Sequence, residues 1–154
     1  MNTKDILLVD DNSDDVVLTV RALKKSKVAN DVVVARDGVE ALDYLFGTGA
    51  HAGRNTRVQP EVILLDIKMP RMDGLEVLRR LRADARTRHI PVVMLTSSKE
   101  DRDLIESYDR GANSFVRKPV DFLEFVEAVQ NLNVYWLVVN EPAPAAGAAI
   151  GGAS

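Results

Sequence analysis

Five short, predominantly apolar runs that do not alternate with polar residues constrain the fold of this chain most strongly. They comprise residues 6–9, 31–35, 62–65, 90–95 and 114–116. Such runs are typical of parallel strands that are buried on both faces of a sheet. Between them, apolar residues recur at helical spacing. Strands that alternate with helices predict a doubly wound α/β domain, whose five-stranded parallel sheet has the strand order 2-1-3-4-5.

The helical stripes and the segments outside them suggest the domain limits. The stripes are Val17, Val20 and Leu23, then Leu75, Leu78 and Leu81, then Phe122, Phe125, Val129 and Leu132. Residues 47–59 form a polar loop that is longer than a strand–helix connection needs. Residues from 141 onward are almost all Ala, Gly and Pro. We therefore expect one domain over residues 1–139, with an extended last helix, and a flexible tail over residues 140–154.

Composition and charge narrow the classes of function. The 154-residue chain has a formal net charge of −3 and therefore lacks the basic excess that nucleic-acid binding requires. It contains no cysteine, which excludes thiol catalysis, disulfides and cysteine-ligated zinc. The first apolar run is too short for a signal peptide or a membrane span. We expect a cytoplasmic protein that binds neither nucleic acid nor membrane.

Polar side chains gather where the predicted strands end. Asp10 and Asp11 follow the first strand, Asp66 the third, Thr96 the fourth and Lys118 the fifth. Ligands of doubly wound sheets bind outside the carboxyl ends of the strands, where the strand order reverses, so we expect these side chains to meet. A hard divalent cation relieves the repulsion between three carboxylates. With the ammonium it makes a phosphate site in which one carboxylate attacks in line.

Each of these residues also has a simpler interpretation. Asp10 or Asp11 could cap the helix that follows. Thr96 could merely end its strand, before a helix that carries its own capping box. Lys118 could be a solvated lysine in a turn. The coincidence of all five polar residues at strand ends favours the functional interpretation.

The segments LLVDDN, LLDIKMPRMDG, VVMLTSS and VRKPV resemble, in this order, the signature segments of response-regulator receiver domains of two-component signalling. The similarity covers residues 4–132. It implies the flavodoxin-like receiver fold and a phosphorylation switch, in which Asp66 accepts the phosphoryl group of a kinase phosphohistidine. It also implies a magnesium ion held by Asp11, Asp66 and the backbone carbonyl of Lys68, with Asp10 contributing through water.

The same resemblance assigns roles to residues around the acceptor. Thr96 and Lys118 would contact the phosphoryl oxygens, and Thr96 would act as a switch together with Phe115. The alternative for Phe115 is a plain buried strand aromatic. The Lys118–Pro119 peptide bond is expected to be cis, which X-Pro bonds allow.

The stretch NVYWLVVNEP and the long loop after the second helix are similar to those of single-domain regulators paired with bacterial phytochrome kinases. This similarity implies a sensor histidine kinase as partner, and a bacterial phytochrome in particular. We expect no DNA-binding output domain. We also expect no enzymatic activity beyond promotion of the protein's own aspartyl phosphorylation and dephosphorylation.

Three other functions fit the sequence less well. A phosphatase of the haloacid dehalogenase type needs a second acid two residues after the nucleophile, where this chain has Lys68. A flavin-binding flavodoxin-like module needs a Ser/Thr/Gly phosphate loop after the first strand, where this chain has Asp10, Asp11 and Asn12. A receiver that acts only as a scaffold would have no need of three mutually repelling carboxylates.

The apolar pattern continues beyond the expected end of the core. A strand of five or six residues spans about 18 Å, which about twelve helical residues cover, so a helix from Asp121 would leave the core near residue 132. Residues 134–139 continue the apolar run, and the spacing of a helix that meets a partner is kept by Phe122, Phe125, Val129, Leu132, Trp136 and Val139. We expect a homodimer that forms without phosphorylation, anchored by Tyr135 and Trp136. Alternatively, the run folds back as a strand or packs under the loop of residues 47–59.

Overall fold

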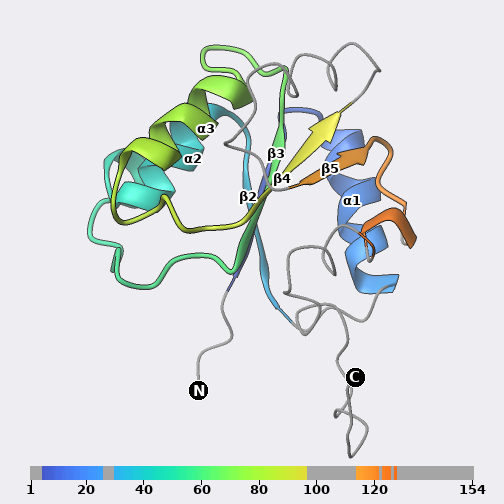
Figure 1. Cartoon of the computed structure of the whole chain (residues 1–154), viewed down its shortest axis with the longest axis horizontal. Helices are drawn as coiled ribbons and strands as arrows, with labels where there is room; N and C mark the ends of the chain where they lie inside the picture. Colours follow the sequence, from blue (N-terminus) through green and yellow to red (C-terminus); the bar gives the residue numbers. More distant parts are fainter. Residues whose placement is uncertain (1–4, 26–29, 97–113, 122, 126, 128–154) are drawn as a thin grey trace, which may run out of the picture.

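The computed structural model describes residues 5–25, 30–96, 114–121, 123–125 and 127. Its strands are β1 (Ile6–Val9), β2 (Val32–Ala35), β3 (Val62–Asp66), β4 (Val92–Thr96) and β5 (Ser114–Arg117). Every pairing between them is parallel, and the order is β2-β1-β3-β4-β5 (Figure 1). The predicted sheet is therefore confirmed in type and in strand order.

The strand ends differ slightly from the prediction, in a way that matters for the site. Asp66 and Thr96 are the last residues of β3 and β4, whereas the sequence pattern placed them just beyond those strands. The sheet pairing continues through both, because Asp66 is opposite Leu95 and Thr96 is opposite Arg117. Two polar residues are thus held by the sheet itself at its carboxyl edge.

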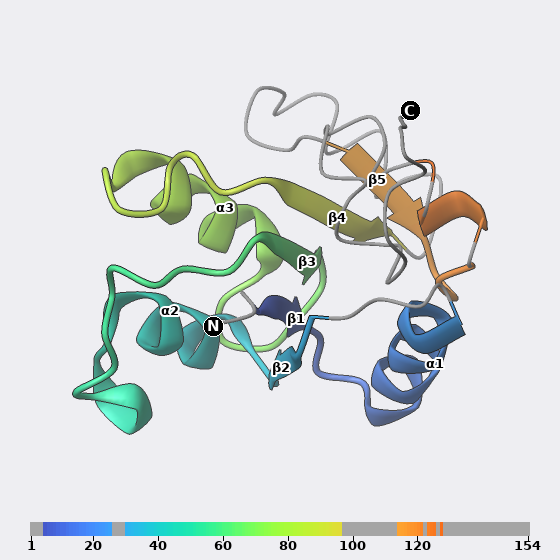
Figure 2. The same ribbon diagram turned by 90° about the horizontal axis from the view of Figure 1, so that it is seen from below.

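Two helical layers enclose the sheet. The helices are α1 (Ser13–Lys25), α2 (Gly38–Phe46) and α3 (Gly74–Ala83). Figures 1 and 2 show α2 and α3 on one face, and α1 with the helical residues 123–125 on the other. Successive strand residues point to opposite faces, so Leu7 and Val9 join the core under α2 and α3, whereas Ile6 and Leu8 join the core under α1.

The buried stripe of α1 differs from the predicted one. Val17 is 48% exposed, and the buried positions instead follow Val16, Thr19 and Leu23. This is again a helical spacing, rotated by one residue. The prediction missed it because Thr19, which is only 1% exposed, is polar. On α3 the prediction holds for Leu78 and Leu81, which are both buried.

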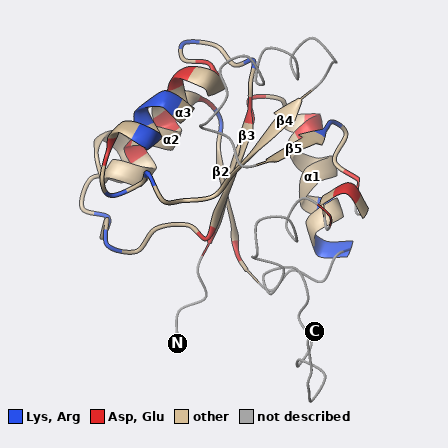
Figure 3. Cartoon of the chain, viewed as in Figure 1, with Lys and Arg blue, Asp and Glu red and all other residues tan. Residues whose placement is uncertain are grey.

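Side-chain caps fix where the helices begin. The Asn12 side chain accepts the Asp15 backbone N–H at 3.0 Å, so Asn12 rather than Asp10 or Asp11 caps α1. At α2 and α3 the caps are Asp37 and Asp73, each of which accepts the backbone N–H three residues on. The alternative interpretation of Asp10 and Asp11 as helix caps is therefore wrong. Along α3, one acidic residue in the first turn is followed by arginines farther along the helix (Figure 3).

The loop of residues 47–59 is more ordered than its composition indicated. It contains a short 3-10 helix, η1 (Gly49–His51). The Arg54 guanidinium lies 3.9 Å from the centre of the Tyr44 ring and donates to the backbone carbonyls of Tyr44, at 2.7 Å, and of Val58. Gln59 donates to the Leu45 carbonyl at 3.0 Å. These bonds fasten the loop to the end of α2.

The C-terminal part of the chain is described only in part. Phe125 is 1% exposed and packs into the core under α1, as its place in the predicted stripe requires. The other five residues of the predicted dimer seam lie outside the described residues, as do Tyr135, Trp136 and the tail. Within the described residues, no helix is both long and apolar enough to cross a membrane.

Candidate functional site

Three carboxylates meet at the carboxyl edge of the two central strands. Val9 of β1 lies opposite Leu65 of β3, so the next residues, Asp10 and Asp66, are neighbours. Carboxylate oxygens of Asp10, Asp11 and Asp66 all lie within 4.8 Å of one another. Asp10 is fully buried and Asp66 is 5% exposed, whereas Asp11 faces solvent. The predicted convergence of these acids is confirmed.

Lys118 brings a positive charge into this cluster from two strands away. Its Nζ lies 3.3 Å from Asp10 Oδ2 and 3.3 Å from Asp66 Oδ2, and its side chain is only 10% exposed. The Lys118 backbone N–H donates to the Thr96 carbonyl at 2.7 Å, and the Lys118–Pro119 bond is cis, as expected. The interpretation of Lys118 as a solvated turn lysine is therefore wrong.

Burial and neighbouring charges set the protonation behaviour of the acceptor candidate. Burial raises the pKa of Asp66 to about 6, with the Lys118 ammonium opposing this rise and the charge of Asp10 adding to it. For Lys118, burial disfavours the ammonium, but hydrogen bonding to Asp15 and the charges of Asp66 and Asp10 hold its pKa above the ordinary value. The Asp66 carboxyl is therefore easier to protonate than an exposed aspartate, even with the Lys118 ammonium beside it.

The loop after β3 is shaped around the end of that strand. Gly74, at the start of α3, donates its N–H to the Ile67 carbonyl at 2.7 Å, and a Cβ added at Gly74 would lie 2.2 Å from the Asp66 carbonyl oxygen. No larger residue fits there. Arg71 adopts a left-handed conformation, with φ 65°, and its guanidinium pairs with Asp37 at the start of α2. Lys68 lies in this loop, two residues after Asp66, and its side chain is exposed.

Thr96 and Phe115 occupy the positions on which the predicted switch depends. Thr96 is 2% exposed at the end of β4. Phe115 is half-buried on β5, opposite Met94, and packs against the core under α2 and α3. Residues 97–113, which follow Thr96, lie outside the described residues. The switch role of Thr96 and Phe115 stays a prediction.

Asp15 is the site residue that the sequence reasoning missed. Its Oδ2 lies 2.8 Å from Lys118 Nζ, closer than either buried aspartate. The signal was weak, because an acid in the first turn of a helix is already explained by the helix dipole. Its position in the first turn of α1, directly after the Asp10–Asp11 pair, could nevertheless have indicated that it lies near the same site.

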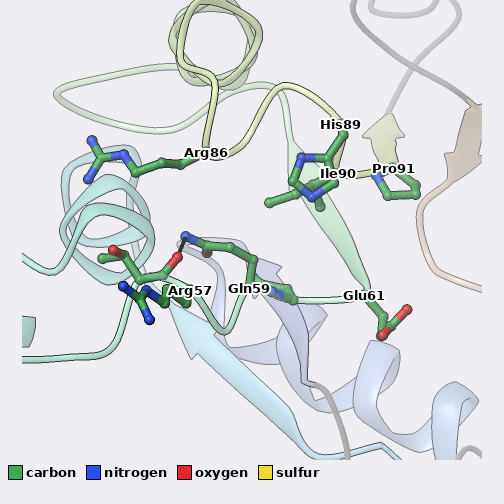
Figure 4. Close-up of a pocket in the computed structure, with 9 residues that line it drawn as sticks. Arg57, Gln59, Glu61, Arg86, His89, Ile90 and Pro91 are labelled. Carbon is green, nitrogen blue, oxygen red and sulfur yellow. Dashed lines mark hydrogen bonds between the residues drawn. The ribbon is translucent and has the colours of Figure 1, made fainter.

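A separate pocket lies at the amino ends of β3 and β4, at the opposite end of the strands from the acidic site (Figure 4). It has a volume of about 480 Å³, and Arg57 and Gln59 line one side, with Arg86, His89 and Ile90 on the other. Because β3 separates this pocket from Asp66 by its full length, the pocket is not part of the acidic site.

The donor set of the acidic cluster suits a hard divalent cation. Carboxylate and carbonyl oxygens are the ligands that magnesium and calcium prefer, and a bound cation would offset the mutual repulsion that helps raise the pKa of Asp66. Buried acids beside a lysine at the strand-order reversal of a 2-1-3-4-5 sheet are the combination of fold and site that a phosphate-binding switch needs.

Comparison with known proteins agrees with this combination. A family model for the response regulator receiver domain matches residues 6–130. The chain therefore belongs to the family of response regulator receiver domains, and it is a signalling switch of the two-component type. Receiver domains of this family bind a divalent metal and have histidine kinases as partners.

Individual relatives match over nearly their whole length. The probable methanogenesis regulatory protein FilR2 of Methanothrix harundinacea is 40% identical over 141 residues, which cover 91% of this chain and 88% of that protein. The structure of the bacteriophytochrome response regulator AtBRR is 52% identical with a TM-score of 0.83, covering 92% of this chain and all of that one. The Mn²⁺-bound form of response regulator Rcp1 is 34% identical with a TM-score of 0.69, covering 91% of this chain and 99% of that one.

Proposed function

We propose that Asp66 is the residue at which this receiver is phosphorylated, by transfer from the phosphohistidine of a sensor kinase. The observation that carries the proposal is the position of Asp66. It is a buried carboxylate at the end of β3, within 4.8 Å of two further acids and 3.3 Å from the Lys118 ammonium. Asp10 is wholly buried, and Asp11 belongs to the loop that leads into α1. Asp66 is the acid best placed to act as nucleophile.

Most roles in the proposed phosphoryl transfer can be assigned to residues of this chain. An oxygen of Asp66 attacks the phosphorus, the phosphorus–nitrogen bond breaks, and the imidazole nitrogen keeps the electron pair of that bond. Lys118 neutralises charge on the phosphoryl oxygens, and Thr96 contributes its hydroxyl. A bound divalent cation supplies further neutralisation of phosphoryl charge. We propose that this cation is Mg²⁺, held by Asp11, Asp66 and the Lys68 carbonyl, with Asp10 acting through water.

The partner and the output belong to the same proposal. We propose that the kinase is a bacterial phytochrome, because the chain is 52% identical to a bacteriophytochrome response regulator over 92% of its length. The receiver domain would span residues 1–139, followed by a flexible tail, in a cytoplasmic protein. The phosphorylated receiver would signal through contacts with other proteins, and these contacts would change when Thr96 and Phe115 respond to the phosphoryl group. It would catalyse only its own phosphorylation and dephosphorylation.

The acceptor assignment can be tested by mass spectrometry of the intact protein after incubation with acetyl phosphate and Mg²⁺. We expect one added phosphoryl group on the wild type, none on Asp66→Asn, and one on Asp14→Asn, which changes an exposed acid nearby. Retained phosphorylation of Asp66→Asn would exclude Asp66 as the sole acceptor. Phosphotransfer profiling against the histidine kinases of the source organism would then identify the partner.

We also propose the homodimer, supported by the apolar spacing that the sequence continues from Phe125, which is buried in the core, to Trp136 and Val139. Sedimentation of the unphosphorylated protein at tens of micromolar should give a dimer, and the Tyr135→Ala/Trp136→Ala double variant should give a monomer. A monomeric wild type, or a double variant that dimerises equally tightly, would contradict this arrangement. Neither result would affect the acceptor assignment.

A further inference from the structure

The Lys118 ammonium is shared among three carboxylates, and one of them lies outside the acidic cluster. Asp10 and Asp66 approach Nζ to 3.3 Å each, whereas Asp15 approaches it to 2.8 Å from α1. The Asp15 side chain is 27% exposed, compared with 0% and 7% for the other two. The closest partner of the lysine is therefore the most accessible of the three acids.

Asp15 is not needed to begin α1. The Asn12 side chain caps the helix by accepting the Asp15 backbone N–H at 3.0 Å. The Asp15 carboxylate is thus left to bind Lys118. Asp14, the preceding residue, is also an acid of the first turn, but it is exposed, and no ion pair joins it to Lys118 within the described residues. Asp14 and Asp15 both carry a negative charge in the first turn of α1, and of these two described residues only Asp15 contacts Lys118.

We propose that Asp15 is a positioning residue that holds the Lys118 ammonium on the α1 side of the site. An ammonium has three donors and no acceptor. Every donor that Asp15 engages is withdrawn from the oxygens of Asp10 and Asp66, with which a cation would also bond. The same donor is unavailable to a phosphoryl group on Asp66, so this second part rests on the proposed function.

Removing the Asp15 charge should therefore have two effects of opposite sign. In the metal-free site without Asp15, the ammonium shifts toward Asp10 and Asp66 and competes with a divalent cation, so cation binding weakens. Once the cation is bound, an incoming phosphoryl donor gains the ammonium donor that Asp15 would have engaged and no longer meets the repelling Asp15 carboxylate, so its binding strengthens. A role confined to helix stability would move neither quantity in this pattern.

The first measurement needs no phosphorylation. Mn²⁺ binding to the full chain would be measured by calorimetry for the wild type, Asp15→Asn, Asp15→Glu and the matched control Asp14→Asn. We expect Asp15→Asn to bind Mn²⁺ about two- to fivefold more weakly than Asp14→Asn, the range that a partly exposed ion pair supports. Asp15→Glu keeps the charge and should stay close to the wild type. Equal losses in Asp15→Asn and Asp14→Asn would overturn the proposal, because only net charge would then be acting.

The second measurement is the dependence of phosphorylation rate on acetyl phosphate concentration at saturating Mg²⁺. We expect the half-saturating concentration of Asp15→Asn to fall about two- to fivefold below that of Asp14→Asn, with limiting rates within about twofold of each other. An unchanged or raised half-saturating concentration would overturn the proposal for the phosphoryl step. If the wild type takes up no phosphoryl group at all, the proposed function fails, while the Mn²⁺ comparison still decides the role of Asp15.

Discussion

Lys118 Nζ lies 3.3 Å from Asp66 Oδ2, although the two residues belong to the ends of β5 and β3, with β4 between them. Two strand spacings amount to about 10 Å, a distance that the long lysine side chain spans above the end of β4. Thr96 ends β4 at this point, and its carbonyl accepts the Lys118 backbone N–H at 2.7 Å. Lys118 therefore reaches Asp66, the proposed acceptor, over a strand whose last residue is the predicted switch threonine.

This geometry predicts that Lys118→Met separates metal binding from phosphorylation. In the proposed site the ammonium competes with a divalent cation for the carboxylates of Asp10 and Asp66, so its removal should leave Mn²⁺ binding at least as tight as in the wild type. Phosphorylation by acetyl phosphate should slow at least about tenfold, because a preorganised positive charge near the transferring group is lost. Calorimetry and a mass-spectrometric time course check the two expectations.

Lys24→Met is the matched control, since Lys24 is an exposed lysine in the last turn of α1. It should change neither quantity. A Lys118→Met variant that is phosphorylated at the wild-type rate would show that the lysine does not act on the transferring group. One that no longer binds Mn²⁺ would show instead that the lysine organises the acids.

The sequence was sufficient for the sheet and for most of the site, for identifiable physical reasons. Uninterrupted apolar runs reveal strands buried on both faces, and the carboxyl-edge rule then brings Asp10, Asp66 and Lys118 together without any coordinates. The contact of Asp15 with Lys118 was not predicted, because an aspartate in the first turn of a helix can serve either the helix dipole or a lysine. The burial of Thr19 was not predicted, because a polar residue in a buried stripe breaks the apolar pattern.

The ordered conformation of the loop of residues 47–59 could not be predicted from the sequence either. It depends on side chains that bond to backbone carbonyls of α2, and composition carries no sign of such bonds. Arg54 donates to the Tyr44 and Val58 carbonyls and lies over the Tyr44 ring, whereas within the described part of the chain Arg57 bonds only through its backbone N–H, to the Asn55 side chain. A polar, glycine-bearing segment can thus be fixed by one arginine.

We accordingly predict that Arg54→Ala lowers the free energy of unfolding by about 1–2 kcal/mol, because two hydrogen bonds and a cation–π contact are lost. Urea unfolding followed by circular dichroism measures this. Arg57→Ala, in the same loop, should change stability by less than about 0.5 kcal/mol. Phosphorylation should be unaffected by either substitution, since the loop joins the end of α2 to the start of β3, away from Asp66. Equal destabilisation by both substitutions would mean that Arg54 does not fasten the loop.

The last prediction concerns the buried acid itself. The pKa of Asp66 is raised from 3.8 to about 6, first by burial. In metal-free buffer the folded protein therefore binds a proton more tightly at this site than the unfolded chain does. Stability must fall as pH rises through the interval between these two pKa values, and the full penalty is present above about pH 6. Asp66→Asn has no such charge, so we expect it to be more stable than the wild type at pH 7.5, by about 1–3 kcal/mol.

Urea unfolding in the presence of a chelator, at pH values from 7.5 down to 4, tests this prediction. The advantage of Asp66→Asn should shrink as pH falls, because the wild-type carboxyl becomes neutral in both the folded and the unfolded state. Asp14→Asn, an exposed neighbour of the site, should show no comparable dependence. Adding Mg²⁺ at pH 7.5 should stabilise the wild type more than Asp66→Asn, since a bound cation offsets the repulsion that the asparagine variant lacks. A stability difference that is constant with pH, or that grows toward low pH, would mean that Asp66 is ionised without penalty in the folded protein.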